Sequence, residues 1–279
     1  MCNSSCKLLI FGCNGMLGSR LAFDLGKIFN VIGVGRNTLT HKQHQKQIQI
    51  DYNSDSIIQT IEDVQPDFVI NCCGWIKQKD SRKSDGVFIN TCFPHLLNEH
   101  SELLKYKLIH FSTDCVFDGK IGFYTEDDKP SANDFYGQTK MLGEVSSPNT
   151  ITLRSSIIGF EVNSKVSLLE WFLSQNEDIE GYSHAYFNGV TTNEMANVVT
   201  CVIKNFQNGL FHVGSQKISK YNLLRKVKEI TKSQMGIKRN GNLKINRVLN
   251  IEKFLNTFKY NVKTWEEMLT QMFENGRIK

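Results

Sequence analysis

The sequence has no long hydrophobic run. Its 279 residues contain no apolar stretch near the roughly 20 residues that a membrane-spanning helix needs. The apolar stretch at residues 8–11 is too short for the core of a signal peptide. We therefore expect no membrane partner and a location in a cytoplasm-like compartment.

Metal-binding spacings and repeats are also missing. None of the eight cysteines stands in a Cys-x-x-Cys pair, a spacing typical of zinc sites, so no metal site is predicted. No internal repeat or low-complexity tract is present. Six cysteines lie inside or beside apolar segments, which favours buried free thiols in a reducing compartment. They are Cys13, Cys72, Cys73, Cys92, Cys115 and Cys201.

The chain has little excess charge of either sign. Lysine and arginine number 33 against 28 acidic residues, a formal net charge of +5, and the basic residues are scattered. This distribution suits a small anionic ligand better than nucleic acid. With 40% hydrophobic residues and 18 phenylalanines, the chain can bury a substantial core, which excludes disorder and a collagen-like architecture.

The first half of the sequence alternates strand-like apolar runs with helical patterns. This alternation is typical of an α/β fold, in which helices cover a doubly wound parallel sheet. Strands are expected at 7–11, 31–34, 47–51, 68–71, 107–112 and 151–154, and helices at 16–28, 55–64, 87–104 and 136–144.

The rhythm breaks after residue 154. Helices are expected at 192–205, 219–231 and twice within 251–273, with a short strand at 209–213. We expect residues 1–155 and about 190–214 to form a nucleotide-binding domain. Residues of about 156–189 and 215–279 are expected to form a smaller, C-terminal substrate lobe.

A glycine-rich turn follows the first expected strand, with the spacing G-x-x-G-x-x-G. Glycines there let the backbone turn sharply and approach a pyrophosphate, whose charge lies on the N–H groups that start the next helix. Short-chain dehydrogenase/reductases use this spacing, so we predict a Rossmann domain that binds a dinucleotide. The expected contacts are Gly12, Asn14, Gly15, Met16, Leu17 and Gly18.

The end of the second strand indicates which dinucleotide binds. An acidic residue there would accept the ribose hydroxyls of NAD, but the sequence has Gly35 and Arg36. A guanidinium suits the 2′-phosphate of NADP(H), which we expect; an exposed surface arginine is the alternative. Asp51, at the end of the third strand, is placed to bond the adenine amino group, with Tyr52 beside it.

Three residues form a candidate catalytic group. Tyr136 and Lys140 stand four apart at the start of an expected helix, so their side chains share a face. A nearby ammonium lowers the pKa of a phenol, which makes it a usable proton donor near neutrality. Thr113 ends a strand at the sheet edge where such folds bind ligands, and its hydroxyl can form a hydrogen bond with a substrate carbonyl oxygen. An ordinary pair on a helix face is the alternative.

These motifs belong to a longer run that resembles the dTDP-4-dehydrorhamnose reductase family of extended short-chain dehydrogenase/reductases. The likeness extends from residue 7 to about 214 and carries Ser112-Thr113-Asp114, Val116-Phe117-Asp118-Gly119, Tyr136-Gly137, Gly143-Glu144 and Arg154. The resemblance implies NADPH-dependent reduction of the 4-keto group of a nucleotide-linked 6-deoxyhexulose. It implies a triad of Thr113, Tyr136 and Lys140, and further cofactor contacts at Cys72, Cys73, Gly74 and Ser112.

The expected sugar pocket departs from the family pattern. The stretch Trp75-Ile76-Lys77 stands where the rhamnose enzymes usually have His or Tyr followed by Thr. It resembles a capsule and O-antigen subgroup that acts on UDP-linked 2-acetamido-2,6-dideoxy-hexos-4-uloses, which we rank ahead of dTDP-4-dehydrorhamnose. Aromatic side chains would hold the acetyl methyl group, and Asn90 or Asn188 its amide; core positions for these aromatics are the alternative. The expected pocket residues are Trp75, Asn90, Thr113, Asp114, Trp171 and Phe187.

Three other functions stay open. Some relatives of the family are NADP-binding regulatory subunits, for example with methionine adenosyltransferase. Cys115 follows Thr113 by two residues, as the epimerase cysteine of GDP-fucose synthases does, but Gly159-Phe160-Glu161 replaces the partner histidine. A 4,6-dehydratase usually has acidic residues after the triad threonine, and Asp114-Cys115 matches half of that pattern. The oligomeric state is also open, with a homodimer among the options.

Overall fold

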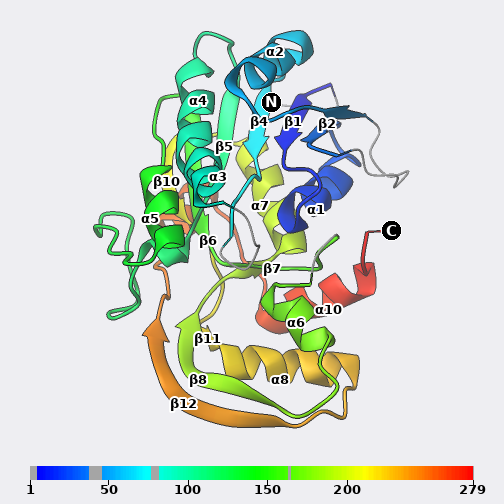
Figure 1. Cartoon of the computed structure of the whole chain (residues 1–279), viewed down its shortest axis with the longest axis vertical. Coiled ribbons are helices and arrows are strands. Elements are labelled where there is room, and N and C mark those ends of the chain that lie inside the picture. The colour runs from blue at the N-terminus through cyan, green and yellow to red at the C-terminus, as the bar shows by residue number, and fades with distance from the viewer. Residues whose placement is uncertain (1–4, 38–45, 77–81, 163–164, 279) are drawn as a thin grey trace.

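The computed structural model describes residues 5–37, 46–76, 82–162 and 165–278. Lys77, part of the expected sugar-pocket stretch, lies outside these ranges. Figure 1 shows a large sheet flanked by helices in the upper part of the molecule and a smaller lobe below it. Among the described residues, no helix is long and apolar enough to cross a membrane.

The large sheet has seven strands in the order β10-β6-β5-β4-β1-β2-β3, all of them parallel. This confirms the predicted doubly wound α/β fold. Side chains of the central strand β1 are buried on both faces of the sheet. The strands are β1 (Lys7–Phe11), β2 (Asn30–Gly35), β3 (Gln47–Gln49), β4 (Phe68–Asn71), β5 (Lys107–Thr113), β6 (Thr150–Ser155) and β10 (Gly209–His212).

Helices cover both faces of this sheet because successive side chains along a strand point to opposite sides. Leu8 and Ile10 of β1 pack in the cluster that includes α1 (Met16–Leu25) and α7 (Thr192–Lys204). Leu9 and Phe11 pack in a second cluster with α2 (Ser54–Val64) and α4 (Phe93–His100). The helix expected at 87–104 is composite: α3 (Lys83–Val87), a π-helical turn η1 (Phe88–Cys92) and α4.

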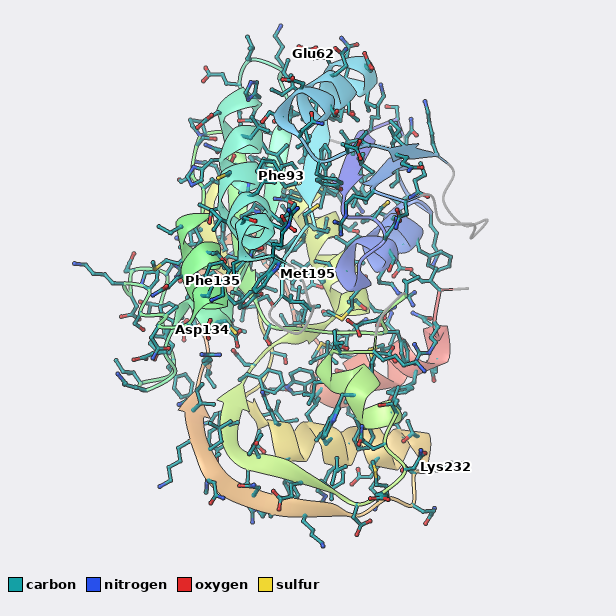
Figure 2. The ribbon with its side chains drawn as sticks, viewed as in Figure 1. Glu62, Phe93, Asp134, Phe135, Met195 and Lys232 are labelled. Carbon is teal, nitrogen blue, oxygen red and sulfur yellow. The ribbon has the colours of Figure 1, made fainter. Side chains whose placement is uncertain are left out.

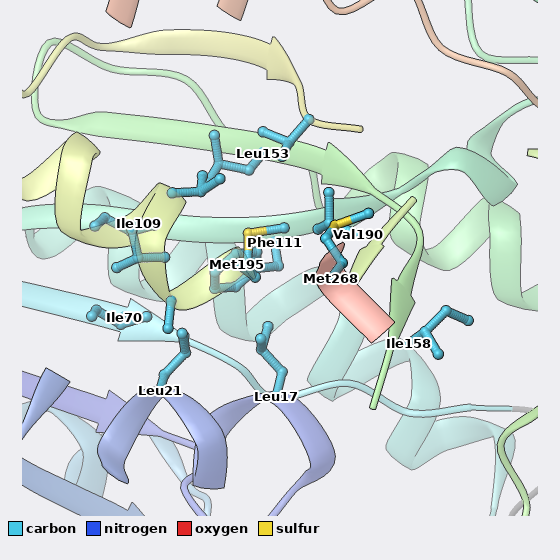
Figure 3. Close-up of a cluster of buried hydrophobic side chains, with 14 of the residues drawn as sticks. Leu17, Leu21, Ile70, Ile109, Phe111, Leu153, Ile158, Val190, Met195 and Met268 are labelled. Atoms are coloured by element: carbon cyan, nitrogen blue, oxygen red, sulfur yellow. The ribbon is translucent and has the colours of Figure 1, made fainter. Parts of the chain in front are cut away.

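The first cluster also joins the end of the chain to the sheet. Leu17 and Leu21 of α1 share this cluster with Met195 of α7 and Met268 of α10 (Trp265–Asn275), as Figure 3 shows. Phe254 of α9 (Glu252–Phe258) is buried in the same cluster. The two helices expected in the tail are therefore part of the hydrophobic core.

The smaller lobe contains a three-stranded sheet, β11-β8-β12, with α8 (Lys220–Thr231) packed on β8. Its strands are β8 (Ile179–Phe187), β11 (Ile218–Ser219) and β12 (Ile237–Asn246). Near it lie α6 (Leu168–Leu173) and the paired short strands β7 (Ile157–Ile158) and β9 (Val190–Thr191). We did not expect β8, because its buried positions include Gly181, Ser183 and Ala185, which give little hydrophobic alternation.

The cysteines only partly follow the prediction of buried free thiols. The six cysteines named above are free, but Cys13 alone among them is buried, and Cys92 is exposed. Cys6, which was not among these six, is disulfide-bonded. In the part of the chain that the structure describes, no group of three or more His, Cys, Asp or Glu side chains could hold a metal ion.

Candidate active site

The turn between β1 and α1 is packed so closely against neighbouring backbone that it requires glycine. Gly12 has φ +79°, and a Cβ atom there would lie 2.9 Å from the carbonyl carbon of Cys72. A Cβ on Gly18 would overlap the carbonyl oxygen of Gly12. No side chain caps the N-terminus of α1 at Gly15, so its N–H groups can bind an anion. The turn therefore fits a dinucleotide pyrophosphate.

Tyr52 stabilises this turn through hydrogen bonds of its hydroxyl group. Its hydroxyl accepts a hydrogen bond from the Gly12 N–H at 3.1 Å and donates one to the Val34 carbonyl at 3.2 Å. The thiol of Cys73 lies 3.4 Å from the same hydroxyl. The expected cofactor residue Tyr52 thus shapes the glycine turn, and burial raises its pKa far above the ordinary value.

Two residues expected at the adenosine end of the cofactor are exposed. Arg36 follows the last residue of β2 and is exposed. Asp51 is also exposed, two residues beyond the end of β3 at Gln49, so it does not end the strand as the sequence suggested. Their roles in binding a cofactor stay predictions.

The three candidate catalytic residues converge at the carboxyl end of β5. Thr113 ends this strand; its hydroxyl donates to Asp114 at 3.2 Å and accepts from the Cys115 N–H at 3.1 Å. Tyr136 is the second residue of α5 (Phe135–Leu142), whose start is marked by Asp134 and Phe135 in Figure 2. A side chain on Gly137 would overlap the Cys115 carbonyl, so this glycine lets α5 approach the loop after Thr113.

The pKa of Tyr136 is shifted opposite to our expectation. Burial raises it, the nearby Cys115 adds to the rise, and the hydrogen bond with Thr113 acts in the lowering direction. We expected the ammonium of Lys140 to lower this pKa, which was wrong because the desolvation of the phenol dominates. The phenol is therefore protonated at neutral pH, the form that can donate a proton.

Lys140 is buried, with 4% of its surface exposed, and Nζ donates to the Phe111 carbonyl at 2.7 Å. Burial lowers its pKa to about 8, against the opposing effect of the Glu144 carboxylate. At neutral pH the Lys140 side chain is therefore charged in most molecules. Since α5 contains both Tyr136 and Lys140 four positions apart, the two residues share one helix face, as the sequence predicted.

Arg154 and Glu144 form a buried ion pair near the candidate catalytic residues. Arg154 of β6 donates to both carboxylate oxygens of Glu144, each at 2.7 Å. The hydroxyl of Ser112 donates to Glu144 at 2.6 Å, and its contact with the cofactor stays a prediction. Arg154 also reaches Nε2 of His212 at 3.1 Å. The sequence motifs contained Glu144 and Arg154, but nothing in their spacing indicated that they form a pair.

The expected substrate residues are not all free to bind a ligand. Asn90 is fully buried; its side chain bonds the backbone N–H and carbonyl of Trp75 at 2.9 and 3.1 Å, and Thr139 at 3.0 Å. Asn188 makes two hydrogen bonds with the backbone of Leu249. These amides are therefore engaged within the protein, and Asn90 holds the backbone of Trp75 in place.

The three expected aromatic residues differ in their environment. Trp75 packs edge-on against Phe135, next to Tyr136, and its buried Nε1 has no hydrogen-bond partner among the described residues. Trp171 on α6 is 36% exposed. Phe187 is buried against Trp265 in the core, which is the alternative that the sequence left open for it.

Comparisons with known proteins fit this arrangement. The RmlD substrate binding domain model matches residues 6–278. The chain belongs to this family. Over 224 residues it is 26% identical to the probable low-salt glycan biosynthesis reductase Agl14 of Haloferax volcanii, with 74% of each chain covered. It is 29% identical over 149 residues to dTDP-4-dehydrorhamnose reductase of Burkholderia thailandensis, covering 52% of this chain and 46% of that one.

Solved structures of the RmlD family and of related enzymes share the fold. The dTDP-4-dehydrorhamnose reductase of Bacillus anthracis in complex with NADP superposes with a TM-score of 0.81 at 20% identity, covering 97% of this chain and 98% of that one. The dTDP-glucose 4,6-dehydratase of the same organism, in complex with NAD, gives a TM-score of 0.80 at 15% identity, covering 97% and 96%. Membership of the RmlD family and the Rossmann fold identify this chain as an oxidoreductase of the extended short-chain dehydrogenase/reductase type.

Proposed function

We propose that this RmlD family member uses NADPH to reduce the 4-keto group of a nucleotide-linked 6-deoxyhexulose in the synthesis of an activated deoxysugar. The convergence of Thr113, Tyr136 and Lys140 at the sheet edge beside the glycine turn carries this proposal. NADPH, when bound, supplies the hydride. The glycine turn, the start of α1 and Arg36 would hold it.

In this mechanism the chain's residues orient the carbonyl and supply the proton. The Thr113 hydroxyl holds the keto oxygen next to the phenol of Tyr136. As charge develops on that oxygen, the protonated phenol donates its proton. Lys140 stabilises the phenolate that remains, because its buried ammonium carries the compensating charge.

The preferred substrate is a UDP-linked 2-acetamido-2,6-dideoxy-hexos-4-ulose, ahead of dTDP-4-dehydrorhamnose. Trp75 supports this choice, because its ring offers an apolar surface beside Phe135 for the acetyl methyl group. The test is kcat/KM for both 4-keto sugars at saturating NADPH. A clear preference for the dTDP-linked sugar contradicts the acetamido choice, and no NADPH oxidation with either sugar contradicts the reductase.

NADPH is expected to bind better than NADH because Arg36 is exposed directly after β2. Replacing Arg36 with alanine removes one charge-assisted phosphate contact, which should cost about 1.5–3 kcal/mol of NADPH binding. Isothermal titration of both dinucleotides checks this, with Arg225→Ala on α8 as the matched control. An unchanged NADPH to NADH ratio would make Arg36 an ordinary surface residue.

Cys115 is expected to be dispensable for the chemistry. Burial raises the pKa of its thiol to about 12, so it is protonated at neutral pH and is a poor base for epimerisation. Cys115→Ser should retain reduction. Product formed in D₂O should carry no deuterium at C3 or C5 beyond a control without enzyme, as mass spectrometry would measure. Deuterium at either carbon would support the epimerase instead.

A regulatory subunit is the second candidate function. The chain is 28% identical over 141 residues to methionine adenosyltransferase 2 subunit beta of Rattus norvegicus, covering 50% of this chain and 41% of that one. Such a subunit binds its catalytic partner without turnover. This function would be favoured if the purified protein binds NADPH and co-elutes with a methionine adenosyltransferase, but does not oxidise NADPH when any of the 4-keto sugars is added.

The organisation of the chain completes the proposal. Residues 1–155 and about 190–214 would bind the dinucleotide, and about 156–189 and 215–279 the sugar nucleotide. β10 lies in the large sheet, whereas β8 and β12 lie in the small one, which supports this division. We place the enzyme in the cytoplasm, with a homodimer as the alternative to a monomer.

A further inference from the structure

The basic residues of the chain are concentrated in one segment, which corrects the scattered distribution expected from the whole sequence. Residues 217–247 contain ten lysines and arginines and one acidic residue, Glu229. This segment alone carries a formal charge of +9, against +5 for the whole chain. It forms β11, α8 and β12 of the smaller lobe. This part of the lobe is therefore strongly cationic, which favours an anionic partner.

One face of the small sheet is exposed to solvent. A Cβ atom on Gly181 of β8 would lie 3.0 Å from the ring of Tyr221, so α8 covers the face to which the odd-numbered residues of β8 point. The even-numbered residues point to the opposite face, and Glu180, Tyr182 and His184 are exposed there. Figure 1 shows β8 and β12 along the lower margin of the lobe, with α8 above them.

Aromatic and basic side chains gather on this exposed side of the sheet. Residues paired across neighbouring strands point to the same face, and the register pairs Lys238 with Glu180. It also pairs Lys244 with His184. The ammonium nitrogen of Lys217, which precedes β11, lies 4.2 Å from the centre of the Tyr186 ring. We define the outer face by its three rings and three cations: Tyr182, His184, Tyr186, Lys217, Lys238 and Lys244.

The cations of the outer face form no ion pair within the described part of the chain. No carboxylate there lies within 4.0 Å of the ammonium group of Lys217, Lys238 or Lys244. Glu180, the acidic residue beside them, accepts a hydrogen bond from the amide of Asn240 at 2.6 Å. All three lysines are exposed. Their charges are therefore available to a polyanion in contact with the sheet.

Exposed rings and unpaired lysines on one sheet face match the chemistry of single-stranded nucleic acid. Bases stack on aromatic side chains while cations contact the phosphates. Interfaces between proteins are poor in lysine, and contact with a bilayer uses aliphatic side chains, which the outer face does not include. Asn242, exposed at the bulge of β12, offers an amide to the 2′-hydroxyl that distinguishes RNA from DNA.

We propose that the outer face binds single-stranded RNA, with bases stacked on Tyr182 and His184 and phosphates bound by the three lysines. None of these residues belongs to the candidate active site, so the proposal does not depend on the proposed function. The balanced charge of the whole chain favoured a small anionic ligand, because it does not show which basic residues the fold brings to one surface.

The test is fluorescence anisotropy with the full chain and a labelled uridine oligonucleotide of about 12 nucleotides, a length within the usual site sizes. Tyr182→Ser should weaken binding by about 5–150-fold, the effect of losing one stacked base. Tyr182→Phe keeps the ring and should bind as wild type does. Lys244→Gln should reduce the slope of log affinity against log salt by about 0.7, the contribution of one phosphate contact. Lys204→Gln, exposed on α7, should leave the slope unchanged.

Three further probes determine what the outer face recognises. An abasic strand of the same length keeps the phosphates but has no bases, and should bind at least about 5-fold more weakly. Equal binding of the abasic and uridine strands would mean that charge alone is recognised, which overturns the proposal. So does tighter binding of the thymidine DNA strand, or binding of anionic phospholipid vesicles without binding of RNA.

A wild-type chain that does not bind the uridine strand, or an unchanged affinity in Tyr182→Ser, also overturns the proposal. Circular dichroism checks that each variant is folded. If Tyr182→Ser is poorly folded, His184→Ser removes the next ring on β8 and should weaken binding in the same range. These measurements need neither NADPH nor a 4-keto sugar, so their result is separate from that of the reductase assay.

Discussion

Replacing Tyr136 with phenylalanine should lower kcat by about 10²–10⁴-fold, the typical contribution of a positioned proton donor. The phenol is buried beside Thr113, and its raised pKa keeps it protonated at neutral pH. Phenylalanine keeps the ring and its packing but has no proton to donate. NADPH binding should change little, because the glycine turn and Lys140 are unaltered.

Steady-state NADPH oxidation with the preferred 4-keto sugar measures this loss, and fluorescence titration measures cofactor binding. Tyr182→Phe is the matched control, since this tyrosine lies on β8 with 41% of its surface exposed. Its activity should equal that of wild type. A Tyr136→Phe enzyme with nearly normal kcat would show that the proton comes from elsewhere, and the proposed mechanism would be wrong.

Arg154→Met should lower the free energy of unfolding by about 3–5 kcal/mol, the cost of removing one partner from a buried ion pair. The guanidinium makes two bonds of 2.7 Å to Glu144, and the side chains are 3% and 13% exposed. Methionine fills a similar volume but leaves the carboxylate buried without its cation. The Phe117 ring, whose centre lies 5.1 Å from Cζ of Arg154, also loses its cationic neighbour.

Urea unfolding followed by circular dichroism measures this change. The double variant Arg154→Met, Glu144→Met should lose less stability than the single one, because no unpaired charge is then buried. Arg225→Met removes an exposed pair with Glu229 and should cost about 0–1 kcal/mol. If Arg154→Met loses less stability than the surface control Arg225→Met, the buried pair contributes nothing to the stability of the fold.

Much of the large domain could be predicted from the sequence because its signals are local. The strands Lys7–Phe11 and Phe68–Asn71 have the predicted bounds, since each is a short apolar run buried on both faces. The smaller sheet could not be predicted in this way. Along β8, the exposed positions include Tyr182 and His184, whereas small residues occupy buried positions, so the hydrophobic pattern is nearly lost.

The candidate site was predictable only as a set of positions. The glycine spacing and the four-residue interval from Tyr136 to Lys140 place the residues correctly, because both depend on the geometry of one turn and one helix. The predicted direction of the pKa shift of Tyr136 was wrong. A pKa depends on burial and on every neighbouring charge, and these come from elements distant in the sequence.

The sequence by itself determined the parallel sheet, the glycine turn and the place of the candidate catalytic residues, because each follows from the spacing of residues along one element. Only the tertiary structure decided which polar groups are already engaged and which are free. It pairs Glu144 with Arg154, occupies Asn90 with Trp75, and brings Arg247 to Phe117 across 130 residues. Such contacts form when different elements of the fold pack together, and no local pattern in the chain encodes them.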